Sequence, residues 1–330
     1  MTESAAHPAQ PTSTPLLFAG TPEIAAQALR GIIAAGYNVT AVLTRPDAPV
    51  GRKKQLTPSP VAQAAETAGI PTIKTAKVDA DITNQVQQTG ARLGVVVAYG
   101  ALLPQHTLEA LPLGWVNLHY SRLPQYRGAA PVQHAMLNGE ATTAATIFQL
   151  EAGMDTGPVH ASAEYTIPEA TSSGTVLAEL TTLGTSLLTK LLPDLLAGNS
   201  QPVGQQGTPS HAPKLTREDA YIDPSEPAEQ LVNRINATIP EPGAWTLNGE
   251  NRLKLGPARL YHGDLSPDAT PGRVLQAISD RAPGDSLIVL TAGDARGVVL
   301  TQVQPAGKAM MNAADWFRGQ QGTVTLGSAA

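Results

Sequence analysis

Asn117, His119 and Ser121 occupy every second position of the segment VNLHYSRLP, with apolar residues between them. This alternation predicts a β-strand that places the three side chains on one face, roughly 7 Å apart at each step. The segment then breaks at Leu123 and Pro124. The polar row therefore lies at the end of a strand, where open α/β sheets bind their ligands. An amide, an imidazole and a hydroxyl at this spacing can grip one small polar molecule.

A carboxylate follows further along the chain. The segment TIFQLEAGMDTGPV predicts an alternating apolar strand that ends in a turn, where Asp155 lies between Gly153 and Gly157. Such a turn can bring the carboxylate close to a histidine on a neighbouring strand. A simpler interpretation is that the polar row belongs to a half-solvated strand with ordinary polar side chains. This second segment argues against that interpretation.

The elements that must position these residues alternate between strands and helices. Residues 16–19 predict a buried strand, Thr21 suits the N-cap of the next helix, Pro22 its first turn and Gly36 its end. Further strands are predicted at NVTAVLT, VVVAY and VNLHY, with a helix at VAQAAETAG and a proline-rich loop over residues 45–60. This order predicts an α/β domain whose parallel sheet is covered on both faces.

The composition changes after about residue 198. Residues 199–215 are dense in Gly, Pro, Ser and Gln, which is typical of a linker. The segment EPAEQLVNRINAT then predicts one amphipathic helix, and several short strands with turn residues between them predict a small β-barrel. We expect a disordered leader at 1–14, a first domain at 15–198, the linker, and a second domain at 216–330.

Composition excludes several classes of protein. The 330 residues are 42% hydrophobic and 15% charged, with a net charge of −5 and no cysteine, so disulfide scaffolds, thiolate nucleophiles and Cys-ligated zinc are excluded. The leader lacks a signal-peptide pattern and the longest apolar run is too short for a membrane span, so we expect a cytoplasmic protein without a membrane partner. The GTPEIA turn lacks the further glycines of a dinucleotide site.

The polar row, the following LP and YRGAAP segments, and Asp155 in GMDTG together resemble the formyltransferase family that uses 10-formyltetrahydrofolate. Within that family, FAGTPE, GRKKQLTPSPV, VVAYG and QPAGK are similar to segments of the members that formylate methionyl initiator tRNA for translation initiation. The similarity covers nearly everything after the leader. It implies a Rossmann-like formyltransferase domain and an OB-like, tRNA-binding C-terminal domain.

The resemblance also implies roles for individual residues, without a metal. The catalytic residues are Asn117, His119 and Asp155. Folate is expected to bind at Val97, Tyr99, Gly100, Ser121, Arg122, Leu123 and Pro124, and tRNA at Arg52, Lys53, Lys54 and Lys308. Tyr120 and Arg122 depart from the small residue and the leucine that are usual in the family.

The implied reaction is direct attack of the methionyl α-amine on the formyl carbon. Asn117, through its amide N–H, and His119, as a donor, are expected to stabilise the developing oxyanion. Asp155 is expected to orient His119, to favour its protonated form, and to accept the amine proton directly or through one water. The implied partners are initiator methionyl-tRNA and the folate donor, and we expect a monomer.

Two alternatives remain open. The first keeps the fold and the donor but formylates a small amine such as glycinamide ribonucleotide or an amino sugar. The second is a tRNA-binding protein with a vestigial catalytic motif. The three cations at 52–54 argue against the first, because such a loop beside an active site can bind acceptor-stem phosphates instead of being a solvated charge run. The intact Asn117, His119 and Asp155 argue against the second.

Overall fold

The computed structural model describes residues 13–327 apart from 52, 267–268, 283–284 and 322. Residues 1–12 of the predicted leader and the predicted tRNA contact Arg52 lie outside the described residues. The chain divides into two compact units. The first holds the chain up to Arg127 together with Ala144–Tyr165 and Leu177–His211, and the second holds Gly128–Thr143, Thr166–Val176 and the chain from Ala212 onward.

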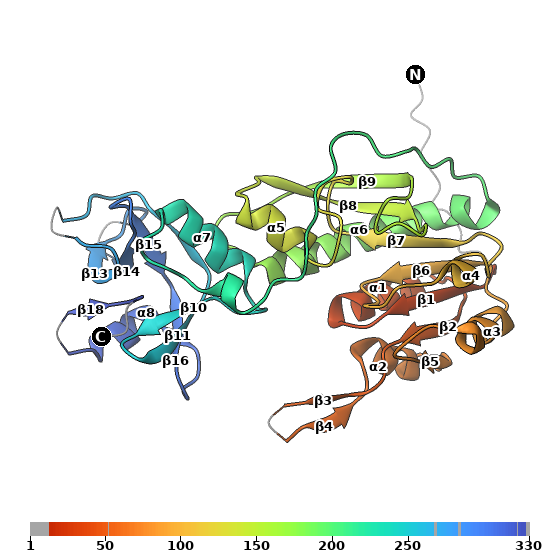
Figure 1. The fold of residues 1–330 in the computed structure, drawn as a ribbon, viewed down its shortest axis with the longest axis horizontal. Coiled ribbons are helices and arrows are strands. Elements are labelled where there is room, and N and C mark those ends of the chain that lie inside the picture. The colour runs from red at the N-terminus through yellow and green to blue at the C-terminus, as the bar shows by residue number, and fades with distance from the viewer. Residues whose placement is uncertain (1–12, 52, 267–268, 283–284, 322, 328–330) are drawn as a thin grey trace. The chain divides into compact units, whose positions relative to one another are not determined.

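A seven-stranded sheet organises the first unit, in the order β5-β2-β1-β6-β7-β8-β9 (Figure 1). Pairing is parallel from β5 through β7, whereas β7 and β8 pair antiparallel. The predicted parallel sheet is confirmed from β5 to β7, and β8 adds an antiparallel neighbour. This direction was not predicted, because apolar periodicity reports which face is buried and not which way a neighbour runs. The strands are β1 (Leu16–Gly20), β2 (Val39–Thr44), β5 (Thr72–Lys74), β6 (Leu93–Val97), β7 (Trp115–His119), β8 (Thr142–Gln149) and β9 (Val159–Thr166).

Helices cover both faces of this sheet, as predicted. Trp115 of β7 packs in a buried cluster with Val86 of α3 and Leu108 of α4. Leu118, on the opposite face of β7, packs on α6, where a Cβ added to Gly184 would lie 2.5 Å from the Leu118 Cδ1. Among the described residues no helix is long and apolar enough to cross a membrane. The helices are α1 (Glu23–Ala34), α2 (Pro60–Thr67), α3 (Ala80–Gln88), α4 (Gln105–Leu108) and α6 (Ser173–Ala197).

The start of α1 differs from the prediction. Pro22, not Thr21, is the N-cap residue, and the Thr21 hydroxyl instead donates to the carbonyl of Tyr99 at 2.7 Å. A local pattern cannot reveal this partner, because it lies 78 residues away in sequence. Gly36 follows the end of the helix with a φ of 83°, as expected of a residue in the left-handed region.

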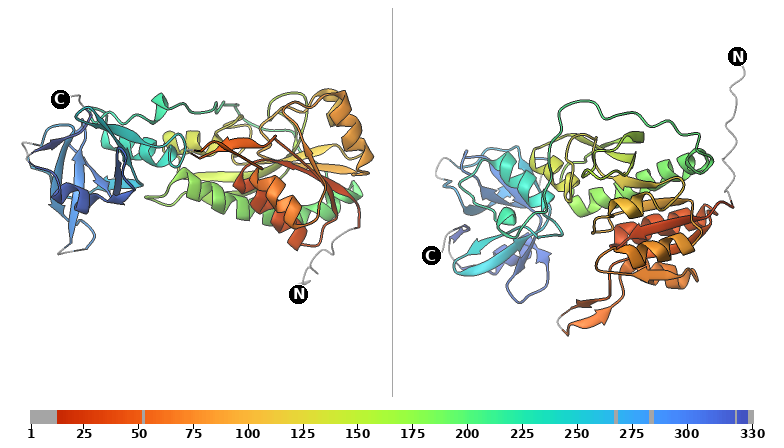
Figure 2. Two further views of the ribbon diagram at one scale, coloured as in Figure 1. Left: turned by 90° about the horizontal axis from the view of Figure 1, so that it is seen from below. Right: turned by 45° about the vertical axis from the view of Figure 1, so that its right-hand side comes forward.

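The proline-rich segment at 45–60 is not a plain loop. It contains a hairpin of β3 (Ala48–Val50) and β4 (Gln55–Thr57), which forms a separate two-stranded sheet and extends away from the main one (Figures 1 and 2). Pro49 is tolerated in β3 because a two-stranded ribbon leaves edge positions unpaired. Val50 and Leu56 are 57% and 68% exposed, so burial does not explain this hairpin.

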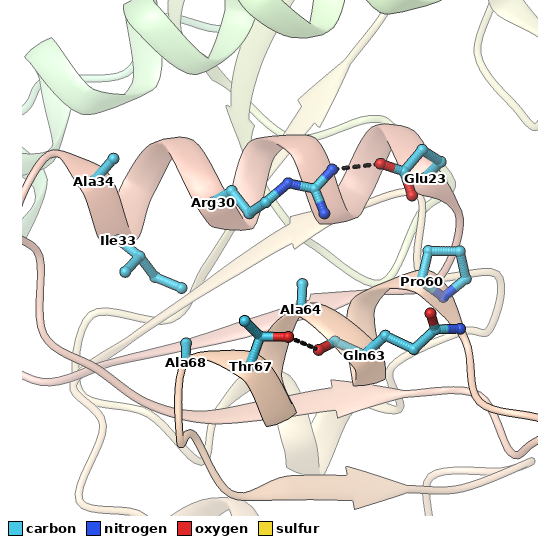
Figure 3. A pocket seen from close by; sticks show the side chains of 9 residues that line it. All are labelled: Glu23, Arg30, Ile33, Ala34, Pro60, Gln63, Ala64, Thr67 and Ala68. Carbon is cyan, nitrogen blue, oxygen red and sulfur yellow. Dashed lines mark hydrogen bonds and ion pairs between the residues drawn. The ribbon is translucent and has the colours of Figure 1, made fainter.

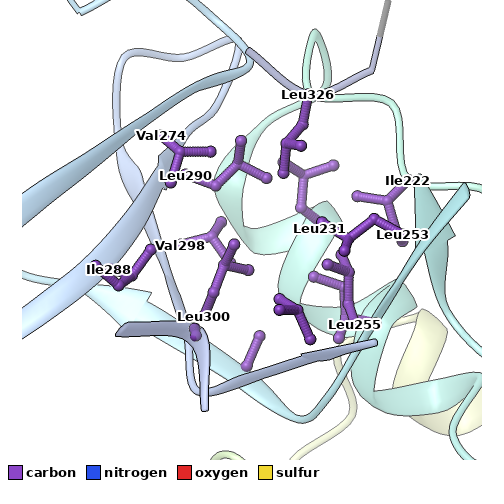
Figure 4. Packing of buried hydrophobic residues seen from close by; sticks show 14 of the residues in the cluster. Ile222, Leu231, Leu253, Leu255, Val274, Ile288, Leu290, Val298, Leu300 and Leu326 are labelled. Atoms are coloured by element: carbon purple, nitrogen blue, oxygen red, sulfur yellow. The ribbon is translucent and has the colours of Figure 1, made fainter. Parts of the chain in front are cut away.

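The second unit contains two antiparallel sheets around one core, as the predicted small barrel requires. The sheet orders are β10-β11-β16-β17 and β12-β15-β14-β13-β18. Leu231 of α7 packs in one cluster with Leu253 and Val298 from the sheets (Figure 4). Ile235 of the same helix belongs to this cluster. The elements are α5 (Pro131–Leu137), η1 (Glu218–Ala220), α7 (Ala228–Ala237), β10 (Trp245–Asn248), β11 (Asn251–Leu255), β12 (Ala258–Tyr261), β13 (Arg273–Ile278), β14 (Ser286–Thr291), β15 (Gly297–Leu300), β16 (Gln302–Pro305), β17 (Met311–Asn312), α8 (Ala313–Arg318) and β18 (Val324–Thr325).

Gly94 provides a test of packing at the centre of the first sheet. It lies opposite Trp115, and a Cβ at Gly94 would come within 2.1 Å of the buried indole, whose Nε1 donates to the Thr107 carbonyl. We expect Gly94→Ala to lower the free energy of unfolding by about 1–3 kcal/mol through overpacking. Chemical denaturation should show this loss, while Gly204→Ala, with nothing within 4 Å of its Cβ, serves as the control. Equal midpoints for both variants would contradict the packing argument.

Candidate active site

The predicted polar row is split between a strand and a turn. Asn117 lies within β7, opposite Val96 of β6 and Phe148 of β8, and the strand ends at His119. Ser121 therefore lies beyond the strand, contrary to the prediction that all three side chains share one strand face. Its buried hydroxyl donates to the carbonyl of Gln125 at 2.6 Å. Alternation in sequence could not distinguish a strand end from the turn that this bond closes.

His119 is buried between two oxygen acceptors. Its Nε2 is 3.0 Å from the carbonyl oxygen of Tyr126, and its Nδ1 is 3.8 Å from the Asp155 carboxylate. Because a carbonyl oxygen can only accept, the hydrogen of this bond belongs to Nε2. The Nδ1 atom is then the ring nitrogen that faces Asp155 and is open to reaction. Phe148 contacts the ring edge to face, with 6.2 Å between the ring centroids.

Burial has the largest effect on the charge of His119. It lowers the pKa of His119 below its ordinary value, while the Asp155 charge and the hydrogen bond to Tyr126 act in the opposite direction. With Nε2–H donating to Tyr126, the neutral ring presents a lone pair at Nδ1. This atom can accept a proton and, once charged, can donate it.

Asn117 carries an unused polar atom. Within the described residues its Oδ1 is buried and makes no hydrogen bond. Burying a polar atom without a hydrogen-bond partner lowers the stability of the folded protein. An unpartnered oxygen at this position therefore fits a site where a ligand supplies the partner. Since the oxygen and nitrogen of a side-chain amide can exchange places by rotation, Asn117 can offer either an acceptor or a donor to that ligand.

Asp155 lies in a tightly held turn, six residues after the end of β8. Its φ is 53°, a left-handed conformation that Asp adopts more readily than most residues. Gly157 has no room for a side chain, because a Cβ there would lie 1.8 Å from the Gln149 carbonyl oxygen. The side-chain amide of Gln205 donates to the carbonyls of both Asp155 and Gly157, each at 2.8 Å. No pattern in the sequence indicates a role for Gln205, because its segment has the composition of a linker.

The predicted folate segments adjoin this strand end. Val97 ends β6, which pairs directly with β7, so the VVAYG segment begins beside Asn117. Tyr99 is buried and, among the described residues, its hydroxyl has no hydrogen-bond partner, while Gly100 has a φ of 82°. A cis peptide bond joins Leu123 to Pro124. The structure thus brings both segments to the same edge of the sheet.

The two residues that depart from the family pattern have partners of their own. The Arg122 guanidinium is exposed and forms an ion pair with Glu164 of β9. The Tyr120 hydroxyl is bonded to Thr181 of α6 at 2.9 Å, and burial raises the pKa of Tyr120 to about 12. Tyr120 therefore acts as a packing residue against α6.

The predicted tRNA contacts belong to separate units. Lys53 and Lys54 are exposed in the turn of the β3–β4 hairpin, and Lys308 is exposed in the second unit. In that unit the Arg252 guanidinium lies 4.4 Å, and that of Arg217 5.5 Å, from the centre of the Trp245 ring. This cation–π group was not predicted, because it depends on the pairing of β10 with β11 and on the position of Arg217.

A hollow of about 450 Å³ lies elsewhere in the first unit, between α1 and α2 (Figure 3). Glu23 and Arg30 form an ion pair along α1 on one side of it, and its other lining side chains are mostly small or apolar. It contains none of the predicted catalytic or folate-binding residues. Among the described residues, no group of three or more His, Asp and Glu side chains is placed to hold a metal ion.

Comparison with known proteins assigns the chain to a family. Residues 16–192 match the formyl transferase family, and residues 214–321 match the formyl transferase C-terminal domain. The chain is 46% identical over 307 residues to the methionyl-tRNA formyltransferase of Renibacterium salmoninarum, covering 92% of this chain and 96% of that protein. The chain belongs to the methionyl-tRNA formyltransferase family. The predicted family and the two-part fold, Rossmann-like then OB-like, are confirmed.

Solved structures show the same fold at low identity. The N-formyltransferase from Helicobacter canadensis, solved in complex with folinic acid and dTDP-3-aminofucose, matches 88% of this chain and 98% of its own, with a TM-score of 0.63 and 16% identity. The methionyl-tRNA formyltransferase from Clostridium thermocellum matches 76% of this chain and 95% of its own, with a TM-score of 0.51 and 16% identity. This chain and these two formyltransferases thus share one fold.

The electrostatics of His119 can be tested by titration. We expect its pKa to lie below the ordinary value near 6.5, and to fall further in Asp155→Asn, because the negative charge that favours the imidazolium is then absent. The neutral form then persists to lower pH. Histidine NMR across a pH series measures this, with His119→Gln used to assign the signal. Asp81→Asn, an exposed change on α3, should leave the titration unchanged, and a rise in the pKa of His119 in Asp155→Asn would contradict the assignment.

Proposed function

We propose that this protein transfers the formyl group of 10-formyltetrahydrofolate to the α-amine of initiator methionyl-tRNA, for translation initiation. The observation that carries the proposal is the meeting of Asn117, His119 and Asp155 at one strand end. This occurs in a chain that is 42–46% identical to curated methionyl-tRNA formyltransferases over nearly its whole length. Those relatives favour a tRNA acceptor over a small amine.

His119 and Asp155 move the proton. The methionyl α-amine is partly neutral at pH 7, because an α-amino group ordinarily has a pKa of about 7.7–8.0. Because Nε2–H is already bonded to Tyr126, Nδ1 is the ring atom available to accept a proton as the amine attacks, with Asp155 stabilising the resulting imidazolium. The charged ring can then donate this proton from Nδ1 to the folate N10 nitrogen, as the tetrahedral centre collapses and the bond between the formyl carbon and N10 breaks. The predicted donor role of His119 therefore belongs to its protonated form.

Asn117 acts on the formyl oxygen. Its amide can donate a hydrogen bond where negative charge develops, and removal of one such donor in other enzymes costs about 2.7–4 kcal/mol. The unpartnered buried Oδ1 supports this role, since the side chain is not committed to a protein partner.

The folate donor supplies the formyl group already attached to a leaving nitrogen. We assign its binding to Val97, Tyr99 and Gly100 after β6 and to residues 121–124 after β7. The buried, unpartnered Tyr99 hydroxyl supports a polar ligand near this loop.

Further proposals concern the domains, the oligomeric state and the location of this protein. We assign catalysis to a domain at 15–198, joined by residues 199–215 to a tRNA-binding domain at 216–330. One chain supplies all three catalytic side chains, which supports action as a monomer. The cytoplasm is the proposed location, because charged initiator tRNA is used there.

The acceptor can be tested directly. The purified protein is incubated with 10-formyltetrahydrofolate and, separately, with charged initiator tRNA, glycinamide ribonucleotide or an amino sugar. We expect formyl transfer to the tRNA alone. Transfer to a small amine would support a small-amine formyltransferase. Transfer to none of the acceptors would support a tRNA-binding protein with a vestigial catalytic motif.

The catalytic assignments predict large losses of turnover. Asn117→Ala, His119→Ala and Asp155→Asn should each lower kcat at least about a hundredfold, because each removes charge stabilisation or proton transfer. In a double variant, the fold-reduction of kcat should be far smaller than the product of the two single fold-reductions. His106→Ala, an exposed histidine on α4, is the control. Turnover near that of the unmodified protein in any of the three would overturn the assigned role.

The hairpin cations predict a change in salt dependence. Lys53→Gln combined with Lys54→Gln should weaken productive tRNA binding and flatten its dependence on salt, by about 0.7–0.9 in slope for each phosphate that the hairpin no longer neutralises. The affinity for folate should hardly change. The measurement is kcat/KM for charged tRNA over a salt series, with Lys190→Gln as the matched removal of an exposed charge. An unchanged slope would leave these lysines as ordinary solvated charges.

A further inference from the structure

Gln205 is held in the first unit by four hydrogen bonds that use its whole side-chain amide. The two bonds donated by Nε2 reach the carbonyls of Asp155 and Gly157 at 2.8 Å and so span Thr156 between them. Its Oε1 accepts from Arg127, at 2.6 Å from Nη2 and 3.3 Å from Nε. The side chain is half-buried. An amide satisfied in this way fixes the backbone of the turn that carries Asp155.

The same segment also holds the other partner of His119. The Ser210 hydroxyl accepts from the backbone N–H of Tyr126 at 2.9 Å, and the Ser210 carbonyl accepts from that of Arg127 at 2.9 Å. The Tyr126 carbonyl is the acceptor for His119 Nε2. Residues 205–210 therefore fix the backbone on both sides of the imidazole.

Both of these backbone positions are in an unfavourable conformation. Asp155 and Tyr126 have φ values of 53° and 58°, in the left-handed region that residues other than glycine seldom occupy. Such conformations persist where surrounding contacts hold them, and they concentrate at functional sites. Gln205 supplies the contact at Asp155 and Ser210 supplies the contact at Tyr126.

We propose that Gln205 is a positioning residue for formyl transfer, which, braced by Arg127, holds the Asp155 carboxylate opposite Nδ1 of His119. The inference rests on the proposed function for its effect on turnover. It goes beyond that function because it gives a segment with linker composition a part in organising the active site. Among the described residues, Asp155 is the charged group whose field acts on His119, so a displaced carboxylate changes the charge state of the ring.

The test compares Gln205→Met with Gln206→Met in the full-length protein. Methionine keeps the length of the side chain and removes every hydrogen bond. The neighbouring Gln206 is exposed, and its one side-chain bond is a 3.4 Å contact to the Gly204 carbonyl. We expect Gln205→Met to lower kcat at least about tenfold, since small errors in the placement of catalytic groups are costly, with KM for folate within about twofold. Gln206→Met should change neither.

A second readout separates positioning from a purely structural anchor. Without the brace, Asp155 moves from Nδ1, so the pKa of His119 measured by NMR in the folate-free protein should fall in Gln205→Met and stay unchanged in Gln206→Met. Gln205→Glu keeps the acceptor for Arg127 but loses both N–H donors. Its kcat should therefore resemble that of Gln205→Met and not that of the unmodified protein.

The inference would be overturned if Gln205→Met left both kcat and the pKa of His119 unchanged. It would also be overturned if Gln205→Met lowered the thermal midpoint of unfolding without changing the pKa of His119. If Gln205→Met does not fold, Arg127→Lys replaces it, because lysine cannot reproduce the two-nitrogen contact to Oε1. The same fall in the pKa of His119 is then expected. An unchanged pKa would show that the contact between Arg127 and Gln205 does not position Asp155. Lack of tRNA formylation by the unmodified protein would refute the proposed function only, since the titration tests the brace without substrate.

Discussion

The proposed active site depends on a buried imidazole with an oxygen acceptor at each ring nitrogen. The Tyr126 carbonyl fixes the hydrogen of His119 on Nε2, and this leaves Nδ1 facing the Asp155 carboxylate at 3.8 Å. Burial favours the neutral ring, whereas the carboxylate favours the charged one. A group under these opposed influences can take up a proton and release it again, as the proposed formyl transfer requires.

The surrounding elements serve this arrangement in different ways. The sheet fixes Asn117 and His119 through the register of β7 with its neighbours. Tyr126 and Asp155 lie on turns, where a regular ladder cannot hold the backbone, so their positions depend on side-chain bonds from Ser210 and Gln205. Rigid strands thus supply two of the functional groups, and braced turns supply their partners.

Much of the fold followed from local sequence. The strands at residues 16–20, 39–44, 93–97 and 115–119 were predicted close to their observed bounds, because buried strands in an α/β sheet are short apolar runs between turn residues. The antiparallel direction of β8 and the hairpin at 48–57 were not predicted. Direction and pairing are set by contacts between distant segments, and the exposed hairpin has little apolar patterning to reveal it.

The sequence by itself determined the family, through an amide, an imidazole and a carboxylate in specific motifs. Only the tertiary structure decided how these side chains are placed. The carbonyl that selects the tautomer of His119 and the amide that secures the Asp155 turn are recognisable only once residues 126 and 205 lie beside the end of β7 and the turn after β8. A backbone carbonyl is the same in every residue, and Gln205 lies 50 residues from Asp155, so neither role leaves a pattern in the sequence.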